Sequence, residues 1–449
     1  MRPIRTKART TAACLFMAAL FLTVGTVCCS QDQKKAPAAT QAVRSVKPGV
    51  EVFLERHVGL VKGKRVGLIT NPTGVDRALR SDVALFLNRP DFEVVALYGP
   101  EHGVRGDAQA GEYVPFYRDP KYGLPVFSLY GETMKPAAGM IKNIDAYMRS
   151  FDTTGKGKQL DKAAVRDLDV MIFDIQDVGT RVYTYIATMA YAMQACAEAS
   201  VPFIVLDRPN PIGGTAMEGP VLEYPAHSSF IGLYPIPLRF GMTVGELAML
   251  FNNRFLEKKV FLTVIPAEGW ERGRWFDETG LPWVMPSPNM PALDTAIVYP
   301  GQVILEGTNV SEGRGTTRPF ELFGAPWIDG YGLAAKLNGL GLPGVAFREA
   351  WFTPTFSKFQ GERCGGCQVH VLDRKAYRPV ETTLAVIKTI RDVYPGMFQF
   401  HADYFDKVMG TSRVRETLES GRTIKDIVAA WAPDLLKFEE LRKPYLLYK

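Results

Sequence analysis

The sequence predicts an α/β protein in which a parallel sheet, covered by helices on both faces, is followed by a smaller α+β domain. Five short apolar runs in the first half of the chain end abruptly in polar or glycine-rich residues. Helical segments such as 185–200 alternate with these runs. Near-continuous apolar strands that alternate with helices are typical of a parallel sheet buried on both faces.

The first 29 residues have the pattern of an export signal. Four basic residues precede the apolar stretch 12–27, and small or polar residues follow it. The stretch is short for a membrane span, although a permanent anchor helix is an alternative. Cys28 and Cys29 stand where a lipoprotein cysteine would stand, but Val27 is large for such a site, so the sequence leaves lipidation open. We expect an exported protein, either periplasmic or associated with the cell envelope, with a membrane tether through a lipidated cysteine as an option.

The remaining chain divides at changes in composition. Residues 30–48 are polar and contain alanine and proline, which predicts a tether. Residues 49–290 hold the alternating strands and helices and form the predicted parallel-sheet domain. Prolines cluster between 282 and 300, and residues 291–449 form the predicted C-terminal α+β domain. A polar stretch at 141–167, helical at its start, is predicted to be a surface insertion.

The net charge of +6 belongs to the export signal and the tether. Residues 1–50 contain eight basic residues against Asp32, a balance of +7, so the rest of the chain carries −1. A nearly neutral body lacks the basic patch that nucleic-acid binding requires, and no nucleic-acid partner is expected.

Chemistry-bearing residues gather where the predicted strands end. In open α/β sheets, ligands bind at the carboxyl ends of the strands. The run at 93–99 leads to a Glu-His pair and an arginine, and two later runs end in carboxylates, an arginine, a tyrosine and an asparagine. The candidates are Glu101, His102, Arg105, Asp174, Asp177, Arg181, Tyr183, Asp207 and Asn210.

A fourth group lies in the polar loop EGTNVSEGR, residues 306–314. A long polar loop in a compact domain is usually functional or disordered, and its glycines permit close approach of the backbone to a ligand. Asn309, Glu312 and Arg314 are its candidates, and a solvated surface loop is the alternative reading.

Several common enzyme classes lack their motifs. No G-x-S-x-G elbow or H-E-x-x-H pair occurs, and no G-x-G-x-x-G fingerprint opens the first predicted strand–helix unit. An α/β serine hydrolase, a dinucleotide cofactor and this zinc motif are therefore disfavoured. We expect no cofactor and no metal. Cys364 and Cys367 have C-x-x-C spacing, which leaves a disulfide or a metal half-site open, but no second C-x-x-C completes a zinc site. Paired carboxylates that act on a glycosidic bond fit the residues that remain.

An ordered set of motifs resembles the exo-β-N-acetylmuramidase NamZ family. The motifs include GLITNPTGVD, LYGPEHGVRG, FDIQDVGTRVYTYI, VLDRPNPIGG and EGTNVSEGRGTTRPFE, and the resemblance covers the chain from about Gly49 to its end. It implies a Rossmann-like domain followed by a smaller domain, with the site in the cleft between them. It also implies release of N-acetylmuramic acid from the non-reducing end of peptidoglycan fragments.

The resemblance makes Glu101 the expected catalytic carboxylate that protonates the leaving oxygen. Asp174, Asp177 or Glu312 is expected to activate water or stabilise the transition state, and the other candidates are assigned to substrate binding. The lactyl carboxylate of N-acetylmuramic acid suits a guanidinium fork, for which Arg105, Arg181 and Arg314 are candidates. A non-catalytic periplasmic protein that binds muropeptides is the alternative. The sequence does not decide between retention and inversion, and it leaves the oligomeric state open.

Overall fold

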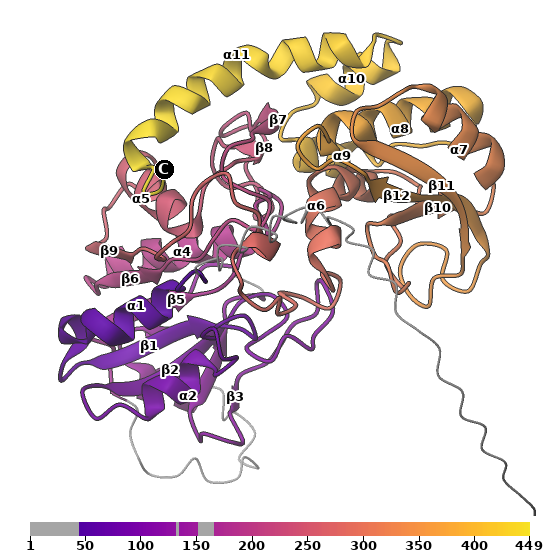
Figure 1. The fold of residues 1–449 in the computed structure, drawn as a ribbon. Coiled ribbons are helices and arrows are strands. Elements are labelled where there is room, and N and C mark those ends of the chain that lie inside the picture. Colours follow the sequence, from indigo (N-terminus) through magenta and orange to yellow (C-terminus); the bar gives the residue numbers. More distant parts are fainter. Residues whose placement is uncertain (1–44, 132–133, 151–165) are drawn as a thin grey trace, which may run out of the picture. The chain divides into compact units, whose positions relative to one another are not determined.

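The computed structural model describes residues 45–131, 134–150 and 166–449 (Figure 1). All of them belong to one compact unit, Val43–Lys449. The predicted export signal, most of the predicted tether and residues 151–165 of the predicted insertion lie outside the described residues. Ser45–Pro48, assigned to the tether from sequence, are ordered, because Val46 is fully buried and Lys47 exchanges two backbone hydrogen bonds with Glu268.

A seven-stranded sheet organises the first half of the chain, as the sequence predicts. Its strand order is β3-β4-β2-β1-β5-β6-β9, and every neighbouring pair is parallel except β3 with β4. The strands are β1 (Arg65–Thr70), β2 (Glu93–Gly99), β3 (Tyr117–Arg118), β4 (Pro125–Ser128), β5 (Val170–Asp174), β6 (Phe203–Leu206) and β9 (Leu262–Ile265).

Helices cover both faces of this sheet, which explains why its strands are apolar throughout. One face presents side chains such as Val66, Val170 and Ile204 to α1 (Gly49–Arg56) and α2 (Asp82–Leu87). The other presents Met171 and Phe203 to α4 (Tyr185–Glu198) and α5 (Val244–Arg254). Successive strand residues point to opposite faces, so both sets must be apolar.

The C-terminal part contains a three-stranded antiparallel sheet with the order β10-β12-β11. Its strands are β10 (Leu322–Ala325), β11 (Val345–Phe352) and β12 (Cys364–Val371), and the helices of this part include α6 (Leu293–Gln302), α7 (Gly330–Gly339) and α8 (Pro379–Val393). The prediction of a parallel α/β domain followed by a smaller α+β domain is confirmed. The exact boundary at residue 290 stays a prediction.

The C-x-x-C segment lies inside β12, where it serves strand packing. Cys364 and Cys367 are buried free thiols. A Cβ atom at Gly366 would lie 1.9 Å from the carbonyl oxygen of Phe323 on β10. Glycine at this position therefore allows β12 and β10 to approach closely.

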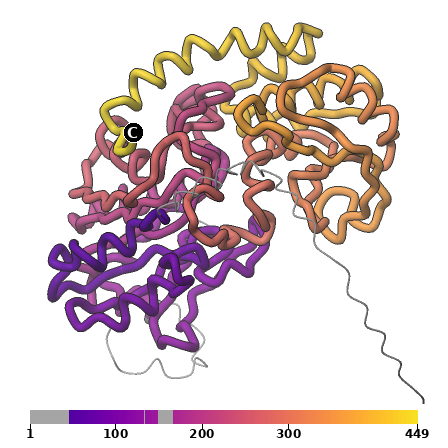
Figure 2. The backbone as a smooth tube through the Cα atoms, viewed as in Figure 1, coloured from indigo at the N-terminus to yellow at the C-terminus, as the bar shows by residue number. Residues whose placement is uncertain are grey.

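The described chain also contains a two-stranded sheet of β7 (Glu218–Val221) and β8 (Pro237–Arg239). Further helices are α3 (Ile144–Ser150), between β4 and β5, and α9 (Ala402–Met409), α10 (Arg413–Glu419) and α11 (Ile424–Arg442), which follow α8. After α11 the chain returns to α5, where the backbone N–H of Leu447 donates to Glu246 (Figures 1 and 2). Within the described residues, no helix combines the length and apolar character needed to cross a membrane.

Candidate active site

A cavity of about 550 Å³ opens at the carboxyl ends of β2, β4 and β5. Segments from both halves of the chain line it. From the sheet domain come the residues after these strands, and from the second half come the loop after α6, the segment after β11 and helix α9. Its polar and charged lining includes Glu101, His102, Tyr130, Thr184, Glu306, Glu312, Arg314, Lys358 and Tyr404.

Glu101 follows β2 directly after Pro100 and lines this cavity. Its Oε1 accepts a hydrogen bond from the backbone N–H of Gly111 at 3.0 Å, and its Oε2 accepts one from the Thr184 hydroxyl at 2.7 Å. Both donors are neutral. No salt bridge to Glu101 occurs within the residues that the structure describes.

His102 is held in a fixed orientation beside Glu101. Its backbone is left-handed with φ of 72°, and its Nδ1 lies 2.8 Å from the carbonyl oxygen of Ala108. A carbonyl oxygen only accepts, so Nδ1 carries the proton and Nε2 keeps its lone pair. Burial lowers the pKa of His102, which outweighs the opposing effect of the Glu101 charge and keeps the imidazole neutral near pH 7.

The glycines around this pair permit the tight turn. Gly103 also has positive φ, 74°, and a side chain at Gly99 would lie 2.8 Å from the backbone nitrogen of Val104. The chain therefore reverses at once after β2 and holds Glu101 and His102 at the end of the strand.

The loop after α6 supplies two glutamates and an arginine to the cavity lining, and Lys358 and Tyr404 contact these glutamates. These residues form the charged wall of the cavity. The Arg314 Nε and Nη2 donate to one oxygen of Glu306 at 3.0 and 2.8 Å, and the Tyr404 hydroxyl donates to the other oxygen at 3.0 Å. The Lys358 Nζ donates to Glu312 at 3.0 Å. Both glutamates in this wall therefore have cationic partners, in contrast to Glu101.

Arg314 and Lys358 differ in the donors that they have left for a ligand. Lys358 Nζ also lies within hydrogen-bond distance of the carbonyl oxygens of Leu305 and Val310, at 2.9 and 3.1 Å, so its three N–H groups are occupied. Arg314 Nη1 makes no hydrogen bond within the described residues. Burial lowers the pKa of Arg314, but Glu306 and Glu312 outweigh that effect and raise it, so the guanidinium is charged.

Five of the residues proposed from sequence line the cavity together: Glu101, His102, Tyr183, Glu312 and Arg314. Sequence reasoning missed Tyr130, Thr184, Lys358 and Tyr404 as site residues. Thr184 lies inside the recognised motif FDIQDVGTRVYTYI, whereas Lys358 and Tyr404 belong to distant segments with no local signal of their own.

Two of the predicted catalytic carboxylates lie outside the cavity lining. Asp174 is fully buried at the end of β5, and its two oxygens accept hydrogen bonds from Arg208 at 2.6 and 2.9 Å. Asp177 accepts from the backbone N–H of Gly179 at 2.6 Å, and burial raises its pKa to about 7. The geometry does not favour either residue as a catalytic group, and their assignment stays a prediction.

Asp207 and Asn210 also support the fold beyond the cavity lining. Asp207 accepts hydrogen bonds from the hydroxyls of Thr243 and Tyr448 at 2.7 and 2.6 Å. Asn210 donates to the carbonyl oxygen of Met242 at 2.8 Å. These contacts join segments around β6, which explains the polar residues at this strand end without a ligand.

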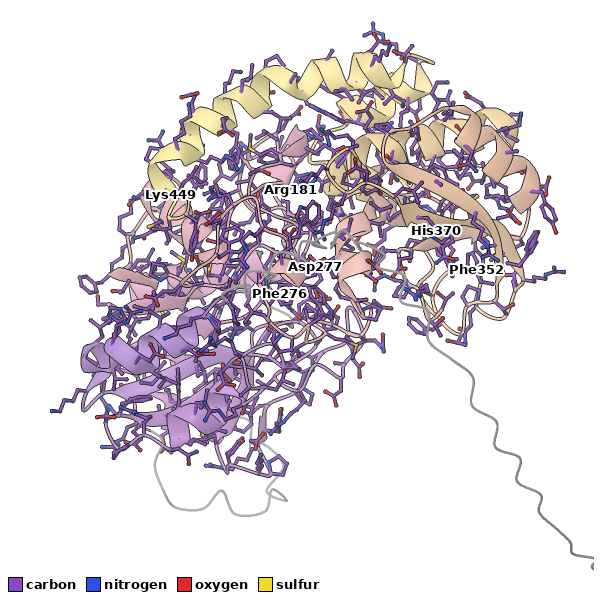
Figure 3. All side chains as sticks on the ribbon, viewed as in Figure 1. Arg181, Phe276, Asp277, Phe352, His370 and Lys449 are labelled. Atoms are coloured by element: carbon purple, nitrogen blue, oxygen red, sulfur yellow. The ribbon has the colours of Figure 1, made fainter. Side chains whose placement is uncertain are left out.

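Three more candidates are engaged elsewhere. Arg181, labelled in Figure 3, is 1% exposed and donates to the backbone oxygens of Pro220, Ile236 and Val408 at 2.8–2.9 Å. Burial lowers its pKa to about 9. Arg105 pairs with Asp119, and Asn309 donates to the carbonyl oxygen of Met397. Of the three predicted readers of a carboxylate, only Arg314 lines the cavity.

Known proteins match this chain over almost its whole length. A family model described as "Exo-beta-N-acetylmuramidase NamZ, N-terminal" matches residues 66–155 and 148–294, and its C-terminal counterpart matches residues 297–448. The peptidoglycan beta-N-acetylmuramidase NamZ of Bacillus subtilis (strain 168) is 49% identical over 430 residues, which cover 96% of this chain and 97% of that protein.

Two crystal structures of DUF1343 family proteins from Bacteroides fragilis NCTC 9343 have similar folds. The first superposes with a TM-score of 0.80 at 39% identity, and the second with 0.69 at 31% identity. Each comparison covers 90% of this chain and 99% of the solved one.

Proposed function

The chain belongs to the exo-beta-N-acetylmuramidase NamZ family, and we propose that the cavity beside Glu101 is where it cleaves the glycosidic bond of a terminal N-acetylmuramic acid. The chain is a glycosidase that releases this sugar from the non-reducing end of peptidoglycan fragments. The observation that supports the placement is Glu101, a cavity carboxylate whose two oxygens accept hydrogen bonds from the neutral Gly111 N–H and Thr184 hydroxyl.

Glu101 acts as the general acid. Cleavage of the glycosidic bond needs a proton on the leaving oxygen, and a carboxyl group at hydrogen-bond distance supplies it. The other two glutamates of the cavity are already paired with cations, Glu306 with Arg314 and Glu312 with Lys358, which leaves Glu101 as the better placed acid. The proton moves from Glu101 to the leaving oxygen as the bond from that oxygen to the anomeric carbon breaks.

His102 accepts the proton of the attacking water. Its Nδ1–H is committed to Ala108, its Nε2 holds a lone pair, and its lowered pKa keeps the ring neutral. The water oxygen bonds to the anomeric carbon, its proton passes to Nε2, and the products are free N-acetylmuramic acid and the shortened fragment. This role goes to a residue that the sequence had assigned to substrate binding.

Arg314 reads the lactyl carboxylate of the sugar. It is the arginine of the cavity lining, and its Nη1 donors are unused within the described residues. A charge-assisted hydrogen bond of this kind contributes about 1.5–3 kcal/mol, or roughly a ten- to hundredfold preference for a sugar that carries the carboxylate.

The test of this function compares two chromogenic substrates that differ in the lactyl group. The purified chain is incubated with the 4-nitrophenyl β-glycosides of N-acetylmuramic acid and of N-acetylglucosamine. We expect release from the first, and a reduced preference in Arg314→Gln. Arg105→Gln, whose pair with Asp119 lies outside the cavity lining, is the matched control. No release from either glycoside, with tight binding of muropeptides in calorimetry, would instead identify a binding protein.

We also propose that the chain is exported, with Cys28 or Cys29 as a lipid attachment site. The support is the basic and apolar pattern of residues 1–29 and the polar stretch that follows. Mass spectrometry of the protein recovered from envelope fractions tests both points. A native N-terminus at Met1 in a cytoplasmic fraction would contradict export, and an unmodified processed N-terminus would contradict lipidation.

A further inference from the structure

We propose that the rings of Tyr130, Phe230 and Tyr191 form an aromatic track that binds the sugars on the leaving-group side of the scissile bond. The proposal rests on the proposed function, since it assumes that Glu101 protonates the leaving oxygen. It adds a binding site for the polymeric part of the substrate, which neither the family membership nor the catalytic groups assign.

The three rings follow one another from the cavity to the surface of a helix. Tyr130 follows β4 and lines the cavity together with Phe230. The centroids of these two rings are 5.7 Å apart. Tyr191 of α4 stacks on Phe230, with a centroid distance of 6.2 Å and an interplanar angle of 5°. Tyr191 is not part of the cavity lining, so the row continues beyond the cavity.

The track begins at the proposed proton donor. Tyr130 and Glu101 line the same cavity, Tyr130 just after β4 and Glu101 just after the neighbouring strand β2. Burial and the Glu101 carboxylate both raise the pKa of the Tyr130 phenol, in keeping with this position. A general acid must stand next to the leaving oxygen. Rings that begin beside Glu101 and lead out of the cavity therefore border the sugar attached through that oxygen and the sugars beyond it.

The chemistry of the rings suits a glycan. All three residues are half-buried, so packing fixes their positions while part of each stays exposed to a ligand. A pyranose ring has an apolar C–H face, and an aromatic ring covers that face without demanding a charge or a particular hydroxyl pattern. Tyrosine adds a hydroxyl that can bond at the rim of the sugar. A repeating saccharide can occupy such a row with more than one sugar unit.

The experiment compares a substrate that reaches along the track with one that does not. The first is an alternating tetrasaccharide with N-acetylmuramic acid at its non-reducing end, and the second is the 4-nitrophenyl glycoside of N-acetylmuramic acid. The measured quantity is the ratio of kcat/KM for the tetrasaccharide to kcat/KM for the glycoside. In Tyr191→Ala we expect this ratio to fall roughly three- to tenfold, mainly through KM for the tetrasaccharide.

Two variants control for loss of structure. Tyr191→Phe keeps the stacking surface and should keep the wild-type ratio. Phe261→Ala removes a ring that is 75% exposed and belongs to neither the cavity lining nor the track, and it should leave both activities unchanged. Alanine is favourable within a helix, so Tyr191→Ala in α4 should fold. Phe230→Ala removes a second ring of the same track.

The outcomes separate this inference from the function on which it rests. An unchanged ratio in both Tyr191→Ala and Phe230→Ala, or an equal fall for both substrates, overturns the track. Wild-type protein that cleaves neither substrate overturns the proposed function itself. A lowered ratio in both variants, with Tyr191→Phe and Phe261→Ala at the wild-type value, supports the track.

Discussion

The end of β2 and the end of β5 lie in the same sheet, and each presents a carboxylate, but their environments differ. Glu101 after β2 lines an open cavity and accepts two hydrogen bonds from neutral donors. Asp174 at the end of β5 is fully buried and forms a two-point salt bridge with Arg208. The position at a strand end is therefore shared by both carboxylates. Their exposure to the cavity and their hydrogen-bond partners determine whether each is available to a ligand.

Asp207 at the end of β6 extends the comparison. Its carboxylate is enclosed by Thr243 and by Tyr448 from the C-terminal end of the chain. Burial raises the pKa of Asp207 to about 6, and the hydrogen bonds from Tyr448 and Thr243 partly offset that rise. The ends of β5 and β6 thus hold the fold together around the strand end that carries the cavity carboxylate.

Of the substitutions that distinguish the end of β2 from the end of β5, Glu101→Gln is expected to have the largest effect, a loss of activity. The amide keeps the shape of the side chain but cannot donate the proton of a carboxylic acid, so kcat should fall by roughly a thousandfold. Initial rates on the alternating tetrasaccharide with N-acetylmuramic acid at its non-reducing end, whose leaving sugar oxygen needs a proton, measure this, with circular dichroism as a folding check. Glu112→Gln, in the same loop and outside the cavity lining, is the matched control. Full activity in Glu101→Gln would remove Glu101 from the mechanism.

Asp174→Asn should damage stability rather than chemistry. The change leaves the buried Arg208 guanidinium without its charged partner, which typically costs about 3–5 kcal/mol of unfolding free energy. Urea denaturation measures the loss. Asp169→Asn, which breaks the part-exposed pair with Arg65, should cost about 1 kcal/mol or less. Equal losses in the two variants would contradict the distinction between a buried and a surface pair.

Asp177→Asn tests how the buried Asp177 carboxyl group changes the pH dependence of the unfolding free energy. The pKa of Asp177 is about 7 in the folded protein against an ordinary 3.8. Between these values the unfolded chain releases a proton that the folded chain retains. The stabilising contribution is therefore complete below about pH 4 and is lost as the pH rises to about 7, by up to about 1.4 kcal/mol per pH unit.

Urea titrations from pH 4.5 to 7.5 check this slope. The unfolding free energy of Asp177→Asn should decline less steeply than that of the wild type. Glu218 also has a pKa raised to about 7 by burial, so Glu218→Gln should flatten the slope in the same way. Parallel curves for the wild type and Asp177→Asn would show that the Asp177 carboxyl does not titrate in this range.

The smallest effect is expected at the end of β6. Tyr448→Phe removes one hydrogen bond donated to Asp207 and one accepted from the backbone N–H of Ala267, which lies 2.9 Å from the hydroxyl. We expect a loss of about 1–2 kcal/mol. Tyr445→Phe is the control in the same tail. Equal unfolding free energies for Tyr448→Phe and Tyr445→Phe would show that the hydrogen bond from Tyr448 to Asp207 does not stabilise the fold.

The sequence alone predicted the sheet and its chemically important edge. Apolar runs that end before Glu101 and at Asp174 placed β2 and β5 correctly, because strands buried on both faces must be apolar along their whole length. The order of motifs identified the family. The Glu-His pair at a strand end was visible as a local pattern and lines the cavity.

The tertiary structure decided which polar residues face the cavity. Asp174 and Glu101 are alike in sequence context. Only the folded chain shows that Asp174 pairs with Arg208, whereas Glu101 has no salt bridge within the part of the chain that the structure describes. Lys358 and Tyr404 reach the wall through contacts between distant segments, which no local pattern encodes. The sequence by itself determined the strands, the family and the candidate carboxylate, because periodicity and motifs are local. The partners, and with them the roles, depend on long-range packing that only the three-dimensional structure fixes.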